Sequence, residues 1–166
     1  MTKAWPWLLL ALLALVAVAN TYYGGQRQPR QLLLNCSSEL YDHDDQQQTQ
    51  YFLLFDLQAS GRDALVNYRY FHTDGSAAGS VMMHGQLTRG AAGINYQIAV
   101  SDKQEQQANG PAPEHMQYLS YISGLNLKNR AVHPMTLEVL DADDKQHYAV
   151  VRVQPGNGVY ACRLQQ

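Results

Sequence analysis

The sequence of this 166-residue chain predicts a mainly β domain, an antiparallel meander that forms a curved sheet or a barrel with one short helix, preceded by an N-terminal transmembrane helix. Three observations predict this fold. Segments in which apolar and polar residues alternate recur along the chain, with turn residues between them. One later segment has helical spacing. The chain also opens with 23 uncharged residues, from Ala4 to Gln26.

The opening segment separates two regions, residues 1–26 as a membrane anchor and residues 27–166 as one exported domain. The 16 strictly apolar residues from Ala4 to Ala19 lie at the short limit of a spanning helix. Aromatic residues near both ends favour a retained anchor, because such belts mark membrane interfaces; they are Trp5, Trp7, Tyr22 and Tyr23. The small-residue site Ala-Val-Ala at 17–19 is typical of signal-peptidase cleavage, so removal after Ala19 is the alternative.

The strand pattern is clearest between Ala64 and His72, where Val66, Tyr68 and Tyr70 alternate with other residues and form the predicted core face. Gly, Pro, Asn and Asp residues punctuate the chain between such segments. Tight turns between successive strands predict antiparallel neighbours. The expected strands are 32–41, 51–57, 64–72, 80–87, 94–100, 135–140, 147–153 and 159–164.

One polar segment, 101–113, is predicted as a long connection. After it, Met116, Leu119 and Ile122 have the spacing of a short helix, 114–123, with Gly124 as its C′ residue. Such a helix is expected to pack over the curved sheet or to plug it.

Charge and motif content exclude several classes of function. The net charge is −2 and Lys and Arg form no run, which argues against nucleic-acid binding. The six His residues are scattered, and the acidic segments 41–45 and 141–145 lack the ligand spacing of a calcium loop. We interpret them as a hairpin loop and a turn. No catalytic motif is found, so we expect no enzyme activity, no metal and no cofactor.

The many Tyr and Met residues are more typical of an aromatic core than of a ligand site. In a barrel too wide to fill, Tyr68, Tyr96 and Tyr118 are instead expected to line an apolar cavity for a small ligand.

The two cysteines, Cys36 and Cys162, are predicted to form a disulfide. Their even number suits an oxidising compartment, and there is no C-x-x-C redox pair. The bond would make the first and last strands neighbours and would stabilise the fold by at most about 5 kcal/mol in the chain-entropy model. The alternative is two separate buried thiols.

The layout resembles the FidL-like family of small bacterial inner-membrane proteins. The resemblance rests on the short N-terminal membrane segment, the first cysteine in LLLNCSSEL, the β-rich exported domain and the last cysteine in VYACRL. It implies a single-pass protein of the bacterial inner membrane with its C-terminal domain in the periplasm. Members of that family are encoded beside ToxR-type transcription regulators and are similar in layout to ToxS-like partners.

The resemblance implies an accessory protein that binds a membrane-bound ToxR-type regulator as a heterodimer and stabilises or modulates it. We expect the contact to be β-strand addition at an uncovered sheet edge. Two alternatives remain: a periplasmic lipocalin-like protein that binds a small molecule, and a chaperone-like assembly factor for a surface structure.

Overall fold

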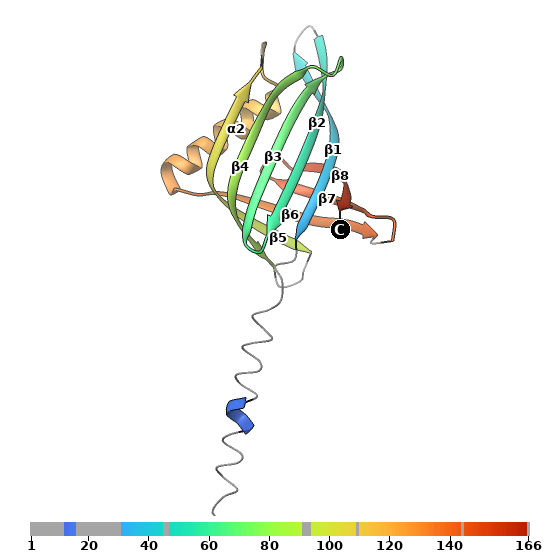
Figure 1. Ribbon diagram of the computed structural model, residues 1–166. Helices are drawn as coiled ribbons and strands as arrows, with labels where there is room; N and C mark the ends of the chain where they lie inside the picture. Colours follow the sequence, from blue (N-terminus) through green and yellow to red (C-terminus); the bar gives the residue numbers. More distant parts are fainter. Residues whose placement is uncertain are drawn as a thin grey trace, which may run out of the picture. The chain divides into compact units, whose positions relative to one another are not determined.

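Within the residues that the structure describes, eight antiparallel strands form a closed barrel in the computed structural model (Figure 1). These residues are 12–15, 31–44, 47–90, 94–108, 110–143 and 145–165. Each strand pairs with the next along the chain, as expected for a meander. The strands are β1 (Leu32–Asp44), β2 (Gln47–Ser60), β3 (Asp63–His72), β4 (Ala77–Arg89), β5 (Asn95–Gln107), β6 (His133–Asp143), β7 (Tyr148–Gln154) and β8 (Gly158–Gln165).

The core lies inside the barrel and follows the two-residue period of the strands. On β3, Val66, Tyr68 and Tyr70 are buried, which confirms the predicted core face. Neighbouring strands contribute inward side chains at matching register positions; Phe55 of β2, for example, lies opposite Tyr68. The inward residues are almost all apolar, so burial of one face per strand stabilises the sheet.

The first and last strands close the barrel, and a disulfide joins them. Residues Leu33–Ser37 of β1 pair with Ala161–Gln165 of β8. Cys36 and Cys162 are register partners, with their Cα atoms 3.9 Å apart, and they form the predicted disulfide. The bond therefore connects strands that are already neighbours across the closure.

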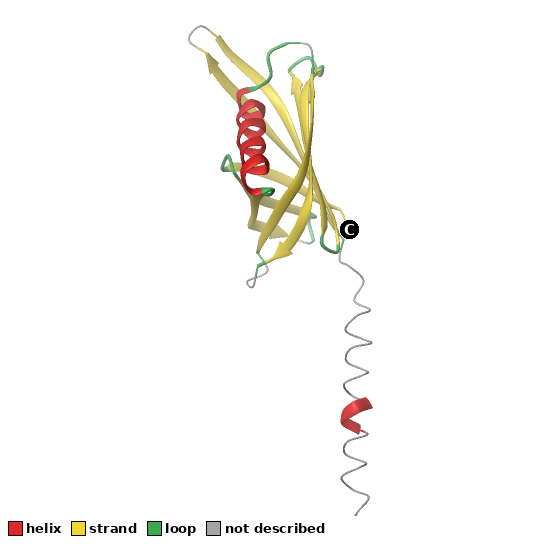
Figure 2. Ribbon diagram, turned by 90° about the vertical axis from the view of Figure 1, so that its left-hand side faces the viewer, coloured by secondary structure: helices red, strands yellow, loops and turns green. Residues whose placement is uncertain are grey.

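The barrel has two halves that are closed differently, because β6 and β8 pair with only part of β5 and β1. In the lower half, β6–β8 complete the wall: β6 pairs with Asn95–Val100 of β5, and β8 pairs with Leu33–Ser37 of β1. The upper half contains Ser38–Asp44 of β1 and Ser101–Gln107 of β5, which pair with β2 and β4 but not with β8 and β6. Helix α2 (Glu114–Arg130) lies against this upper half (Figure 2).

Helix α2 packs against the barrel through Met116, Leu119 and Ser123, which are buried. Its position is held by Lys103 of β5, whose ammonium group donates a 2.7 Å hydrogen bond to the carbonyl of Ser120. The helix confirms the predicted covering element, and Met116 and Leu119 lie on its buried side as expected.

The helix is longer than predicted, and Gly124 is not its C′ residue. Gly124 lies inside α2, which ends where Ala131 adopts the left-handed conformation with φ 58°. The Ala131 N–H donates to the Leu127 carbonyl. A glycine costs about 1 kcal/mol inside a helix, which packing on the barrel outweighs.

Two polar segments predicted as loops are strand instead. The segment 101–113 was expected to be a connection, but β5 continues through Gln107. The segment 41–45 was expected to be a hairpin loop, but β1 continues through Asp44. The extension of β5 leaves most of its side chains in water, so it carries no apolar alternation. Pairing with β4 and β2 satisfies the backbone of the two extended strands.

The chain divides into two compact units between Arg30 and Gln31, and the predicted boundary was at residue 26. Leu12–Leu15 are helical. The aromatic belt residues Trp5, Trp7, Tyr22 and Tyr23, and the cleavage site at 17–19, lie outside the described residues. Across the described ranges, no helix has the length and hydrophobicity needed to cross a membrane.

Candidate functional site

Aromatic rings occupy the interior where an apolar ligand cavity was expected. The Phe55 ring lies 5.0 Å from that of Tyr68 and 5.2 Å from that of Tyr160, between ring centroids. Burial raises the pKa of Tyr160 to about 12 and raises the pKa of Tyr68 well above its ordinary value. These hydroxyls therefore stay protonated near neutral pH and supply neither a base nor a nucleophile.

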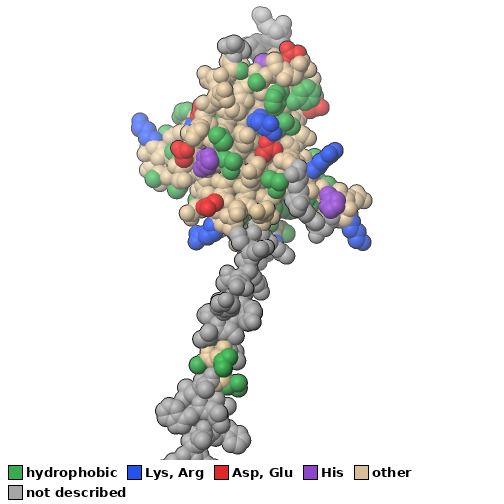
Figure 3. All heavy atoms as spheres, viewed as in Figure 1, with side chains coloured by type: hydrophobic (Ala, Val, Ile, Leu, Met, Phe, Trp, Pro, Cys, Tyr) green, Lys and Arg blue, Asp and Glu red, His purple; other side chains and the backbone are tan. Residues whose placement is uncertain are grey.

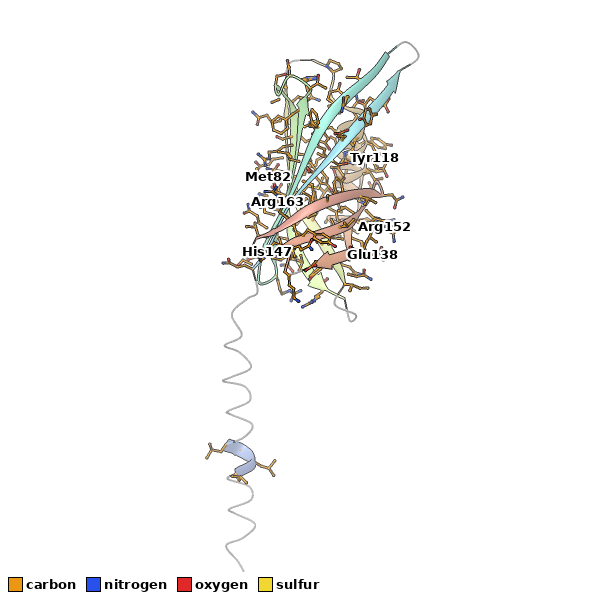
Figure 4. All side chains as sticks on the ribbon, turned by 90° about the vertical axis from the view of Figure 1, so that its right-hand side faces the viewer. Met82, Tyr118, Glu138, His147, Arg152 and Arg163 are labelled. Atoms are coloured by element: carbon orange, nitrogen blue, oxygen red, sulfur yellow. A yellow bond between two sulfur atoms is a disulfide. The ribbon has the colours of Figure 1, made fainter. Side chains whose placement is uncertain are left out.

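The three tyrosines predicted to line one cavity occupy different environments. Tyr68 is buried in the barrel, and Tyr96 is half-buried on β5, where its ring lies under the Arg89 guanidinium. Tyr118 is 47% exposed on α2 (Figure 4), so it does not line the interior. Its position follows from Met116 and Leu119, which take the buried face of the same helix.

The segment 141–145 was predicted to be a turn, but the turn begins later, because β6 continues through Asp143. The Asp143 carboxylate accepts the backbone N–H groups of Lys145 and Gln146. A carboxylate that bonds its own turn is an ordinary turn device. Among the described residues, no group of three or more His, Cys, Asp or Glu side chains is placed to hold a metal ion.

An open depression of about 680 Å³ crosses the outer face of the lower half. Register partners Leu33, Gln58, Leu65 and His84 form a row across β1–β4 within its lining. Ligand pockets typically enclose most of a small molecule, whereas this surface is open. Among the described residues of its lining there is one carboxylate, Asp63, and no Lys or Arg, so no Lys or Arg is present to pair with that carboxylate and orient a ligand.

At the top of the barrel, β1 meets the N-terminus of α2. One oxygen of the Asp42 carboxylate accepts the Glu114 N–H at 2.8 Å. The helix has no cap from its own side chains, so a residue 72 positions away supplies the acceptor. An anionic group at a helix N-terminus also interacts favourably with the helix dipole. Asp42 therefore fixes α2 to the upper half of β1.

His115, the next residue of α2, faces the barrel interior. Its Nδ1 atom lies 2.8 Å from the Tyr70 hydroxyl, and its ring is 5.9 Å from the rings of Tyr68 and Tyr70. Burial lowers the pKa of His115, although the Asp42 carboxylate opposes that shift. The imidazole is therefore neutral at neutral pH and serves the packing of α2.

The upper half of β1 has a second edge that no described strand covers. β2 pairs with all of Leu32–Asp44, whereas β8 pairs only with Leu33–Ser37. We call the uncovered side of Ser38–Asp44 the free edge. The hairpin of β1 and β2 extends beyond the end of α2 (Figure 2), and α2 contacts chiefly β4, β5 and β6.

The disulfide shows which backbone groups point to the free edge. A Cα separation of 3.9 Å identifies Cys36 and Cys162 as a non-hydrogen-bonded pair, so the backbone N–H and C=O of Cys36 point toward β2. Successive residues direct these groups to alternate sides of a strand. Glu39 and Tyr41 therefore present their N–H and C=O groups at the free edge.

The outer face beside the free edge carries a carboxylate between aromatic rings. Glu39 accepts a 2.7 Å hydrogen bond from the Tyr41 hydroxyl and a 3.3 Å bond from the Gln50 amide. Phe52 lies opposite Glu39 on β2. Tyr41 is 54% and Phe52 is 39% exposed. We call Glu39, Tyr41, Gln50 and Phe52 the edge patch.

The surface charges are dispersed on the face that Figure 3 presents. Figure 3 shows Lys and Arg side chains placed singly on the face it presents, with no dense basic area. Arg69 pairs with Asp56. Arg152 pairs with Glu138, and Figure 4 labels both residues. A nucleic-acid surface needs a concentrated basic footprint, which this face lacks.

Comparisons with known proteins assign no family: no family model matches the chain, and no curated protein matches it in sequence. Sequence reasoning expected an uncovered edge without locating it. The relevant stretch is LLLNCSSELY, where the odd-numbered positions after Cys36 are Ser37, Glu39 and Tyr41. That alternation describes an outward face and does not show that a strand lacks a neighbour.

Proposed function

We propose that this chain is a membrane-anchored periplasmic accessory protein that binds a membrane-bound ToxR-type transcription regulator and stabilises or modulates it. The observation that carries the proposal is the free edge of β1. A closed barrel normally leaves no strand edge, and proteins usually cover or disrupt exposed edges because they recruit other strands. An edge left open over several residues is a natural docking site for a partner strand.

The compartment and the anchor are part of the same proposal. The Cys36–Cys162 disulfide supports an oxidising compartment such as the periplasm. The helical residues Leu12, Leu13 and Leu15 are 62–70% exposed, which suits a segment surrounded by lipid. Anchoring both partners in one membrane raises their effective concentration, so a modest interface suffices.

The alternative functions differ in what supports them. A lipocalin-like carrier needs an enclosed apolar cavity, and the ring contacts of Phe55, Tyr68 and Tyr160 occupy that region of the barrel. An assembly factor for a surface structure would use the same free edge as a regulator partner. The experiment must therefore distinguish a regulator as the partner from a subunit of a surface structure as the partner.

The deciding experiment deletes this chain in its host and measures the regulator and its output. We expect the steady-state level of the membrane-bound regulator, or the transcription of its targets, to fall and to recover on complementation. Complementation by Tyr41→Pro is expected to fail, because proline removes the N–H that points to the free edge. Tyr41→Ala separates the two contributions, since it removes the ring but keeps the N–H, and it is expected to complement the deletion partly.

The same deletion strain can also contradict the proposal. If both the regulator level and target transcription stay unchanged in the deletion strain, under conditions where the regulator is active, the proposal is wrong. Loss of an assembled surface structure without any change in the regulator would favour the assembly factor.

A further inference from the structure

We propose that the free edge of β1 recognises an extended segment of another protein that carries an arginine or lysine opposite Glu39, with the cationic side chain held over the edge patch. This inference rests on the proposed function, in that it names the chemistry of the partner strand. Three independent features lead to it: the backbone groups, the edge patch and the charge of the edge.

The backbone of β1 fits an added strand. Glu39 and Tyr41 each present one N–H donor and one C=O acceptor at the free edge, so an extended segment gains two pairs of main-chain hydrogen bonds. Side chains of such a segment alternate between the two faces. The residue paired with Glu39 therefore projects onto the same outer face as the Glu39 carboxylate.

The edge patch is suited to a cation. The Glu39 carboxylate is oriented by the Tyr41 hydroxyl and the Gln50 amide, and within the described ranges no Lys or Arg pairs with it. The rings of Tyr41 and Phe52 are exposed around it. A guanidinium can bond the carboxylate and lie over an aromatic face at the same time, which favours arginine over lysine.

The charge of the edge selects against a second copy of this chain. Ser38–Asp44 carries three acidic residues, Glu39, Asp42 and Asp44, and no Lys or Arg. Two such edges placed side by side would bring acidic side chains close together without a cationic partner, which is destabilising. The occupant is therefore a different chain, and the full-length protein is expected to be monomeric.

The test measures strand binding to the full-length protein in detergent micelles by fluorescence anisotropy. The probes are fluorescein-labelled nine-residue peptides of alternating threonine and valine, with arginine, glutamine or glutamate at the centre. An exposed ion pair and a cation–π contact together predict that the arginine peptide binds about 5- to 30-fold more tightly than the glutamine peptide. The glutamate peptide should bind most weakly.

Two variants localise the effect. Glu39→Gln keeps the backbone and removes the ion pair, so it is expected to reduce the preference for arginine to about 2- to 5-fold, the part supplied by the cation–π contact. Tyr41→Pro is expected to weaken all three peptides, with circular dichroism to verify the fold. If Tyr41→Pro does not fold, Glu39→Gln decides the question alone. An unchanged arginine preference in Glu39→Gln would overturn the inference, as would equal binding of the three peptides to the wild-type protein.

The two proposals fail in different ways. If the deletion leaves the regulator unaffected while the arginine preference is present and depends on Glu39, the edge specificity stands and the regulator partner is wrong. A second outcome is that the regulator level falls in the deletion strain, that complementation with Glu39→Gln restores it, and that the wild-type protein binds the three peptides equally. The regulator partner then stands and the edge specificity is wrong.

Discussion

Asp42 is predicted to stabilise the domain by capping a helix that is distant in the sequence. Its carboxylate accepts the Glu114 N–H at 2.8 Å, and α2 has no side-chain cap of its own. In Asp42→Ala this N–H loses its acceptor and the helix dipole loses an anion. A lost cap typically costs about 0.5–2 kcal/mol, and the dipole interaction accounts for about 0.3–1 kcal/mol.

We therefore expect Asp42→Ala to lower the free energy of unfolding by about 1–2 kcal/mol, and Asp42→Asn, which keeps an acceptor oxygen, by about half as much. The assay is urea unfolding of the full-length protein in detergent, followed by circular dichroism. For a domain of this size the larger loss corresponds to a Tm decrease of about 5–10 °C.

Asp102→Ala is the matched control, because Asp102 is an exposed strand aspartate. It should change the free energy of unfolding by less than about 0.5 kcal/mol. If Asp42→Ala is no more destabilising than Asp102→Ala, the Asp42–Glu114 contact does not stabilise α2 on the barrel and the reasoning is refuted.

Three further predictions concern the barrel. Gly85→Ala should lower the free energy of unfolding by at least about 2 kcal/mol in urea. The added Cβ would overlap the backbone of β5 at the register shift beside Gly85, and a paired backbone cannot move aside at low cost. A loss below about 0.5 kcal/mol would contradict this. Replacing both Cys36 and Cys162 by alanine should cost about 2–5 kcal/mol, since the bond closes the barrel between its first and last strands; an unchanged urea midpoint would count against it. Burial lowers the pKa of His115 and His133, so the folded state disfavours their protonated forms. Their contribution is complete above pH about 6.5 and is lost as pH falls toward the folded pKa values, by at most about 1.4 kcal/mol per pH unit for each histidine; equal urea midpoints at pH 7.5 and 5.5 would refute it.

Strand content could be predicted where each strand has one buried face. Val66, Tyr68 and Tyr70 alternate with other residues, and all three are buried, because a strand that covers a core must place every second side chain inside. The same rule failed at 101–107, where β5 extends past the core of the lower half. The side chains there are largely exposed, so selection for alternating hydrophobicity is absent while the backbone is still paired.

The candidate site was less predictable than the fold. Glu39 and Tyr41 belong to an ordinary outward-facing pattern, and nothing in it shows that β8 stops pairing at Ser37. Asp42 was interpreted as part of a solvated loop, whereas it contacts a helix 72 residues later. Both features depend on where strands end relative to one another, which is a property of long-range register.

The sequence by itself determined the local geometry: the strand periods, the turns, a helix with an apolar side and two cysteines suited to a disulfide. These depend on neighbouring residues, whose spacing is written in the chain. Only the tertiary structure decided that the meander closes, that β6–β8 close one half and α2 covers the other, and that β1 keeps a free edge. Closure depends on the relative lengths and register of strands far apart in the sequence, and no local pattern of side chains encodes that register.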